Sequence, residues 1–210
     1  MEDSGKVYGF TLSLPEDAKT IPTLWETTKA FMAKFPDMVA KENFIEFISN
    51  DGGNSYNGCH FWSNFEIGNL VNLSGLSHCL SQNFWRNVSY STYFDYLDQT
   101  GGFFYERWGD APIHSIATAM FLKPEQVLFF NDIGYTHSVF THCPNEPEFR
   151  HKCHCNPADS IDLNGLSIAT LVILTIQLIL AGYDGLRLQA RIDGIVIMSI
   201  NPFKPTYTAP

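Results

Sequence analysis

The sequence predicts an α/β domain, because short apolar segments typical of strands alternate with amphipathic segments typical of helices. A chain of 210 residues is long enough for one such domain with a sizeable core. Its 45% hydrophobic and 17% charged residues exclude an intrinsically disordered chain. The net charge of −9 argues against a nucleic-acid partner, since sequence-independent binding to phosphates needs a basic face.

The first part of the chain is predicted to form one strand and two helices. Residues 6–14 alternate between apolar and polar side chains, which is typical of a strand, and a proline ends the pattern. Residues 22–35 begin with a proline and carry an apolar stripe at helical spacing. A second, short helix is predicted at 44–48, and the sequence Asn-Asp-Gly-Gly at 50–53 marks a turn after it.

The middle of the chain gives the clearest helices. Residues 88–97 place four apolar residues on one helical face, and two glycines then stop the helix; the face comprises Tyr90, Tyr93, Phe94 and Leu97. Another helix is expected to begin at Asp110, and residues 126–130 form a buried strand. Residues 141–160, rich in Pro and Cys, are predicted to be loop. This order of elements favours a mostly parallel sheet.

The last fifty residues differ from the rest. Residues 161–210 hold three acidic and three basic side chains, so the whole negative charge lies before them. Leu166–Ala181 is an uncharged run of 16 residues, short of the roughly 20 that a membrane-spanning helix needs. We therefore favour a buried segment over a membrane span there, and treat 161–210 as an atypical hydrophobic tail, either non-native or membrane-associated.

Two aromatic runs, Tyr56–Glu66 and Gly101–Asp110, contain the candidate chemistry. Flat aromatic faces beside carboxylates are typical of sugar sites, although a large aromatic core explains the same density. The three carboxylates are Glu66, Glu106 and Asp110. Two of them have a structural alternative to catalysis: Asp110 can cap a helix, and Glu106 can pair with Arg107. Glu66 has no neighbouring cation and no helical pattern, so it is the strongest catalytic candidate.

A cluster of cysteines and histidines near residue 150 has two interpretations. Its members are His142, Cys143, His151, Cys153, His154 and Cys155. Disulfides in an oxidising compartment are favoured over zinc, because the cysteine spacing departs from common zinc patterns. Upstream of this cluster, His137 follows the exit of a predicted strand, where ligands are often presented.

Five long motifs carry a family resemblance: GKVYGFTLSL, TIPTLWETTKAF, YNGCHFWSNFEIGNL, YFDYLDQTGGFFYERWGDAPIHSIATAMFL and FFNDIGYTHSVFTHCP. Together they cover roughly residues 3–157, and the segment resembles the fungal α-1,2-mannosyltransferases of glycosyltransferase family 15. The resemblance implies a GT-A-like mixed sheet with flanking helices. It also implies transfer of mannose from GDP-mannose to a mannose-terminated glycan acceptor, with retention of configuration and with Mn²⁺. Such transfer would serve protein glycosylation and fungal cell-wall mannoprotein synthesis.

The resemblance also assigns roles to residues. Glu66 corresponds to the proposed nucleophile, Asp110 lies in the same site, and His137 resembles the histidine ligand of the metal. The other members of the two aromatic runs are expected to bind substrate: Tyr56, His60, Trp62, Asn64, Glu106, Arg107 and Trp108. A retaining glycoside hydrolase built on Glu66 and Glu106 fits the carboxylates but not the motif order.

The family further implies a lumenal Golgi enzyme with an N-terminal membrane anchor. Against that pattern, the chain is expected to be the C-terminal part of the catalytic domain over residues 1–160, incomplete at the N-terminus. It contains no Glu-Pro-Asp sequence, the family motif whose acidic side chain holds Mn²⁺. Residues 71–82 interrupt a family motif, and we expect them to be an atypical insert. The alternative function is therefore an inactive fragment that only binds sugars or glycans.

Overall fold

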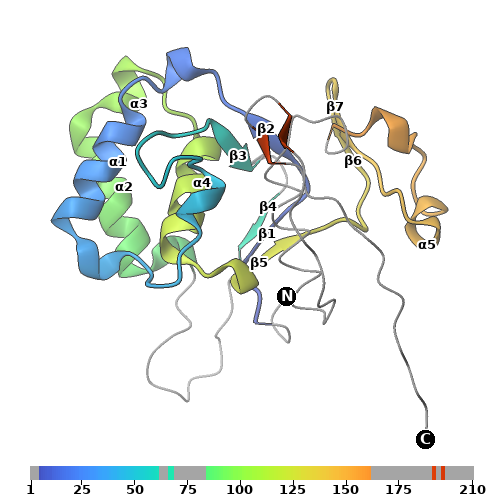
Figure 1. Ribbon diagram of the computed structural model, residues 1–210, viewed down its shortest axis with the longest axis horizontal. Helices are drawn as coiled ribbons and strands as arrows, with labels where there is room; N and C mark the ends of the chain where they lie inside the picture. Colours follow the sequence, from blue (N-terminus) through green and yellow to red (C-terminus); the bar gives the residue numbers. More distant parts are fainter. Residues whose placement is uncertain (1–4, 62–65, 69–83, 162–190, 193–194, 197–210) are drawn as a thin grey trace, which may run out of the picture.

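The computed structural model describes residues 5–61, 66–68, 84–161, 191–192 and 195–196. Helices lie on one side of the central strands, and a hairpin with a short helix lies on the other (Figure 1). The strands and helices are β1 (Tyr8–Phe10), β2 (Ser13–Pro15), α1 (Leu24–Lys34), β3 (Cys59–Phe61), β4 (Glu66–Gly68), α2 (Val88–Thr100), α3 (Gly102–Tyr105), α4 (Asp110–Phe121), β5 (Val127–Phe129), β6 (Tyr135–His137), β7 (Phe140–His142), α5 (Pro147–Arg150), β8 (Arg191–Ile192) and β9 (Ile195–Val196). The expected mixed α/β architecture is confirmed.

The central sheet has the strand order β4-β1-β5. β1 is parallel to β5 and antiparallel to β4, so Phe10 has Phe129 on one side and Glu66 on the other. The carboxyl ends of β1 and β5 therefore meet the amino end of β4 at one edge. The prediction of a mostly parallel sheet is wrong. β4 follows β3 in the chain and pairs with β1 in the antiparallel direction, so a helical crossover does not connect β4 to the sheet.

The strand predicted at 6–14 is divided into two. β1 belongs to the central sheet, whereas β2 pairs with β3 in a separate two-stranded sheet. Thr11 and Leu12 lie between β1 and β2, and four residues lie between β3 and β4 in the sequence. The antiparallel register therefore shifts by two residues between the Phe10–Glu66 pair and the Ser13–Phe61 pair.

Three of the four predicted helices are confirmed, with one face corrected. In α2, Asn87 caps the first turn by accepting a hydrogen bond from the Tyr90 amide, and Gly101 ends the helix at φ 77°. Phe94, predicted on the buried face, is 43% exposed and lies beside Phe103. The short helix predicted at 44–48 is a single 3-10 turn over Ile45–Phe47.

Aromatic side chains form most of the core. Phe10 and Phe61 pack with ring centroids 4.1 Å apart between the sheet and the helices. Phe31 of α1 packs edge-on against Tyr93 of α2, and the Tyr93 hydroxyl lies 2.8 Å from the hydroxyl of Thr28. In the two aromatic runs, the alternative interpretation as core is correct for Phe61 and Trp108, which are buried.

The cysteine cluster forms a disulfide between Cys143 and Cys155, and Cys153 remains a thiol. The disulfide interpretation is therefore confirmed over zinc. The region predicted to be loop also holds the end of β7 and the short helix α5 (Pro147–Arg150). It contains more regular structure than predicted, and the disulfide joins Cys143, just after β7, to Cys155, which follows α5.

Other predictions concern residues beyond the described ones. The atypical insert at 71–82 and the apolar run Leu166–Ala181 both lie outside them, so these remain predictions. Within the described ranges, no helix is long and apolar enough to cross a membrane.

Candidate active site

Glu66 is the first residue of β4 and the direct partner of Phe10 in β1. It therefore stands at the edge where the carboxyl ends of the parallel strands β1 and β5 meet. Ligands of open α/β sheets bind at this kind of edge. The structure fixes the backbone position of Glu66, whereas its side chain, like Trp62 and Asn64, lies outside the described part.

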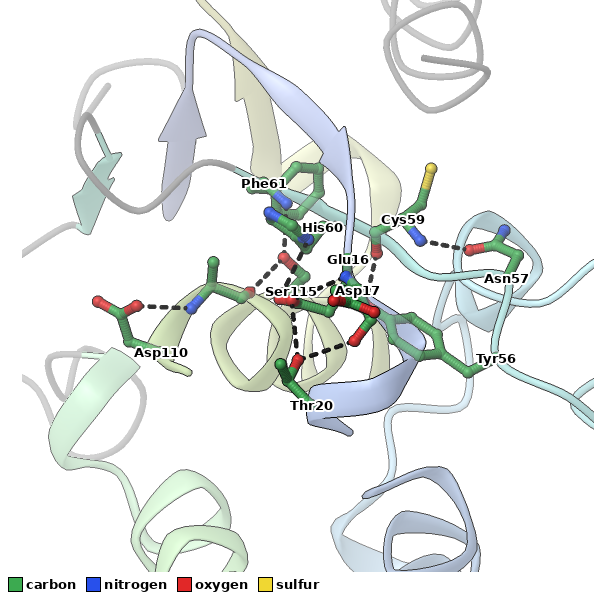
Figure 2. A network of polar contacts seen from close by, with 11 residues as sticks. Glu16, Asp17, Thr20, Tyr56, Asn57, Cys59, His60, Phe61, Asp110 and Ser115 are labelled. Carbon is green, nitrogen blue, oxygen red and sulfur yellow. Dashed lines mark hydrogen bonds and ion pairs between the residues drawn. The ribbon is translucent and has the colours of Figure 1, made fainter. Parts of the chain in front are cut away.

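His60 is buried in β3, and its Nδ1 atom lies 3.7 Å from an Oε atom of Glu16 (Figure 2). Burial lowers the pKa of His60 below its usual 6.5, while the charges of Glu16 and Asp110 act in the opposite direction. The neutral imidazole is thus favoured in the fold. The sequence did not point to Glu16, because the pair arises only when β2 and β3 come together.

Tyr56 helps to position the start of β3. Its hydroxyl donates a hydrogen bond of 2.7 Å to the carbonyl oxygen of Cys59, and its ring stacks on Trp25. Burial raises the pKa of Tyr56 well above its usual value, so the phenol stays protonated. Sequence reasoning assigned Tyr56 to substrate binding. These contacts give it a structural role beside the site.

Asp110 is exposed at the first turn of α4. One of its carboxylate oxygens accepts a hydrogen bond of 2.9 Å from the amide of Ala111. The N-cap position itself belongs to Gly109, so the predicted capping role of Asp110 is corrected by one residue. Further along α4, Ser115 joins this turn to Phe61 of β3 through hydrogen bonds (Figure 2). Sequence reasoning missed Ser115, which is a polar residue within a mostly apolar helix.

Glu106 closes the amino end of α1. Its carboxylate accepts hydrogen bonds from the amide and the hydroxyl of Thr23, at 3.0 and 2.7 Å, and from the Trp108 indole at 2.8 Å. Burial alone would raise the pKa of Glu106, but the hydrogen bonds from Thr23 and Trp108 lower it below its usual value. One alternative had predicted an ion pair between Glu106 and Arg107. Glu106 instead accepts hydrogen bonds from Thr23 and Trp108.

Arg107 lies between two fixed neighbours. Its φ of 68° is in the left-handed region, which is unfavourable for a residue with a side chain. Trp108 is buried against Gly102, where an added Cβ would lie 2.3 Å from the indole ring. With Glu106 bonded and Trp108 buried, the backbone is held so that Arg107 is exposed. Trp108 is therefore a core residue, whereas Arg107 remains accessible to a ligand.

His137 ends β6 and is exposed on the hairpin opposite the helical side (Figure 1). The hairpin is tied back to the end of β5, since the His142 ring stacks edge-on with Phe129. No group of three or more His, Cys, Asp or Glu side chains within the described ranges could hold a metal ion. One exposed imidazole does not make a Mn²⁺ site, because Mn²⁺ favours several oxygen ligands. The described residues alone therefore do not fit the metal.

A three-stranded mixed sheet with helices on one side and a glutamate at the carboxyl edge of its parallel strands defines an α/β domain with an edge suited to ligands. The model of the glycolipid 2-alpha-mannosyltransferase family matches residues 1–172, and the chain belongs to this family. The family predicted from the motifs is thereby confirmed, and the two solved structures described below confirm the predicted fold.

Curated relatives from yeasts support the same assignment. The chain is 58% identical over 169 residues to glycolipid 2-alpha-mannosyltransferase 2 of Candida albicans, covering 80% of this chain and 34% of that protein. It is 47% identical to the glycolipid 2-alpha-mannosyltransferase of Saccharomyces cerevisiae, covering 80% of this chain and 36% of the relative. The chain thus spans about a third of the length of these relatives.

Two solved structures share the fold. Core-mannan synthase A from Aspergillus fumigatus, in a Mn/GDP form, aligns with a TM-score of 0.65 at 40% identity, over 82% of this chain and 43% of that one. The mannosyltransferase Ktr4p from Saccharomyces cerevisiae, in complex with GDP, aligns with a TM-score of 0.68 at 34% identity, over 81% of this chain and 44% of that one.

Proposed function

We propose that this chain supplies the catalytic part of an α-1,2-mannosyltransferase that moves mannose from GDP-mannose to a mannose-terminated glycan. The observation that carries the proposal is the place of Glu66 at the carboxyl edge of β1 and β5. Membership of the mannosyltransferase family and the GDP complex of a solved relative support the donor.

The chemistry follows from retention of configuration, which takes two displacements at the same carbon. In the first, the Glu66 carboxylate attacks the anomeric carbon of mannose, and the bond to the GDP oxygen breaks. In the second, a 2-hydroxyl of the acceptor attacks that carbon, the bond to Glu66 breaks, and the hydroxyl proton passes to Asp110. Asp110 suits this role because it is exposed at the start of α4, whereas Glu106 is engaged with Thr23.

Arg107 and His137 complete the proposed site. The exposed guanidinium of Arg107 is suited to hydrogen bonding with sugar hydroxyls or phosphate. His137 is the proposed imidazole ligand of Mn²⁺, the ion in the Aspergillus structure. Since the described residues do not fit the metal by themselves, the acidic ligand would come from an upstream family segment that contains Glu-Pro-Asp.

The test is transfer of labelled mannose from GDP-mannose to α-methyl-mannoside, with Mn²⁺ and then with a chelator. We expect no measurable transfer by the 210-residue chain alone. A version extended upstream by the relatives' segment through Glu-Pro-Asp should transfer mannose and lose this activity on His137→Ala. An extended protein that binds GDP-mannose but never transfers it would overturn the proposed function. Robust metal-dependent transfer by the short chain would overturn the metal assignment.

A second candidate function is glycan binding without transfer. It is favoured by the exposed aromatic residues of α3, since Phe104 is 79% and Tyr105 is 89% exposed. Binding of mannose oligosaccharides by the 210-residue chain, without transfer by the extended version, would support this second function over the first.

For location, we propose the Golgi lumen, with a membrane anchor upstream as the family implies. The Cys143–Cys155 disulfide supports an oxidising compartment. Colocalisation of the tagged full-length protein with a Golgi marker tests the proposal, and a cytosolic distribution would contradict it.

A further inference from the structure

A buried hydroxyl links β3, the strand that precedes Glu66 in the chain, to α4, the helix that begins with Asp110. Ser115 of α4 is fully buried, and its Oγ accepts a hydrogen bond of 2.7 Å from the amide of Phe61, the last residue of β3. The same Oγ donates a hydrogen bond of 2.7 Å to the carbonyl oxygen of Ala111. Figure 2 shows this hydroxyl between the strand and the first turn of the helix.

The bond to Phe61 supplies an acceptor for a buried amide at the edge of β3 that faces away from β2. Among the described strands β3 pairs only with β2, so the outward amides of Cys59 and Phe61 need other acceptors. Cys59 uses the side chain of Asn57, and Phe61 uses Ser115. Because the position is buried, water is not available to replace Ser115 as an acceptor.

The bond to Ala111 fixes the other segment. A serine that donates to the carbonyl four residues earlier is held in one rotamer, and it ties its own turn to the preceding one. Ala111 is also the residue whose amide donates to the Asp110 carboxylate, at 2.9 Å. The hydroxyl of Ser115 thus lies two hydrogen bonds from the carboxylate of Asp110.

The strand side leads to the other carboxylate. Phe61 ends β3, and Glu66 begins β4 five residues further along the chain. Between these two strands the antiparallel register shifts by two residues. Phe61 itself packs on Phe10, the backbone partner of Glu66.

We infer that Ser115 is a positioning residue, which holds the end of β3 against the first turn of α4 and thereby sets the distance between Glu66 and Asp110. This inference rests on the proposed function. A displacement of about 1 Å between reacting groups can reduce the rate about a hundredfold, so one hydrogen-bonding hydroxyl is enough to matter.

Thr118 provides a matched control on the same helix. It is fully buried like Ser115, but its hydroxyl makes no hydrogen bond within the described part of the chain. Thr118→Val removes a buried hydroxyl from α4 without removing a hydrogen bond to β3. It therefore reports the cost of altering the helix core alone.

The experiment compares Ser115→Ala, Ser115→Thr and Thr118→Val. In the upstream-extended protein, kcat and KM for GDP-mannose are measured with α-methyl-mannoside as acceptor. Ser115→Ala should lower kcat about tenfold or more and change KM less than about twofold. Ser115→Thr keeps an Oγ and should recover part of that loss, and Thr118→Val should retain a near-normal kcat.

Hydrogen exchange on the 210-residue chain gives a readout that needs no activity. The Phe61 amide should exchange roughly five- to tenfold faster in Ser115→Ala than in the unchanged chain, and normally in Thr118→Val. Unchanged exchange at Phe61 would overturn the inference whether or not the protein transfers mannose. Equal loss of kcat in Ser115→Ala and Thr118→Val, or normal kcat in Ser115→Ala, would also overturn it. An extended protein with no transfer at all would instead refute the proposed function, and the exchange result would still decide the hydrogen-bond link.

Discussion

Glu106 holds the amino end of α1 through Thr23, a residue 83 positions earlier in the chain, with hydrogen bonds of 3.0 and 2.7 Å. Thr23 is the N-cap of α1, and its own side chain does not cap the helix. The motif loop between α3 and α4 therefore reaches across to a different helix. Glu106 was predicted to bind substrate, but its carboxylate holds the start of α1 through these hydrogen bonds.

Substitution of Glu106 should therefore reduce stability. Glu106→Ala removes the acceptor for two groups of Thr23 and should lower the free energy of unfolding by about 1–2 kcal/mol. Glu26→Ala is the control, since it removes only the exposed ion pair with Lys29 on the same helix and should cost less than about 0.5 kcal/mol. Urea denaturation measures both. Equal losses in the two variants would contradict the bridging role of Glu106.

The buried pair of His60 and Glu16 predicts a dependence of stability on pH. Burial lowers the pKa of His60 in the folded state, so below the usual value of 6.5 the unfolded chain binds more protons at this position. The contribution of His60 to stability is thus present above 6.5 and is lost as the pH falls toward the lowered pKa.

The measurement is urea denaturation between about pH 7.5 and about pH 5.5, where stability should fall with decreasing pH. His60→Gln should reduce that slope. His151→Gln, which replaces an exposed imidazole, is the control. A slope reduced equally by both substitutions, or by neither, would contradict the assignment to His60.

The disulfide predicts a specific labelling pattern. After alkylation without reductant, peptide mapping should recover Cys143 linked to Cys155 and Cys153 alkylated. Replacing Cys143 and Cys155 by Ser should cost roughly 3 kcal/mol, the value expected for a loop of about 15 residues. Cys153→Ser should cost much less. The alternative is a zinc site. It would be supported if the purified chain contained zinc and if Cys143, Cys153 and Cys155 were all alkylated without reductant.

The proposed insert can be tested by deletion. Removing the 12 residues Val71–Gln82 should raise soluble yield, and it should also raise activity in the extended protein. Loop closure costs only about 0.6 kcal/mol per doubling of length, so the objection to these residues is their place just after Glu66 rather than their length. If the deletion variant fails to fold, residues 71–82 belong to the domain.

Local signals made much of the fold predictable. Asn87 and Gly101 delimit α2 because a capping side chain and a left-handed glycine act within a few residues of their own position. The start of α4 at Asp110 was also predicted, although Gly109 and not Asp110 is its N-cap. The division of the first strand was not predictable. Thr11 and Leu12 carry no local break, and β2 leaves the central sheet because β3 offers it a separate partner.

The candidate site was predictable in part, through motifs rather than through contacts. The motifs pointed to Glu66, Asp110 and Arg107, and the structure places the first at a sheet edge suited to ligands and the other two on accessible surface. The roles of Glu16 and Ser115 were not predictable. Their hydrogen bonds and charges act across β2, β3 and α4, which sequence spacing does not bring together.

The central claim is that Glu66 carries out mannosyl transfer at the carboxyl edge of β1 and β5. The most direct measurement is the rate of labelled mannose transfer from GDP-mannose to α-methyl-mannoside by the upstream-extended protein and its Glu66→Gln variant, with GDP-mannose affinity measured alongside. We expect the variant to lose at least about a hundredfold in kcat with little change in affinity, because a transition-state group is lost. A variant that transfers mannose at a near-normal rate would contradict the claim.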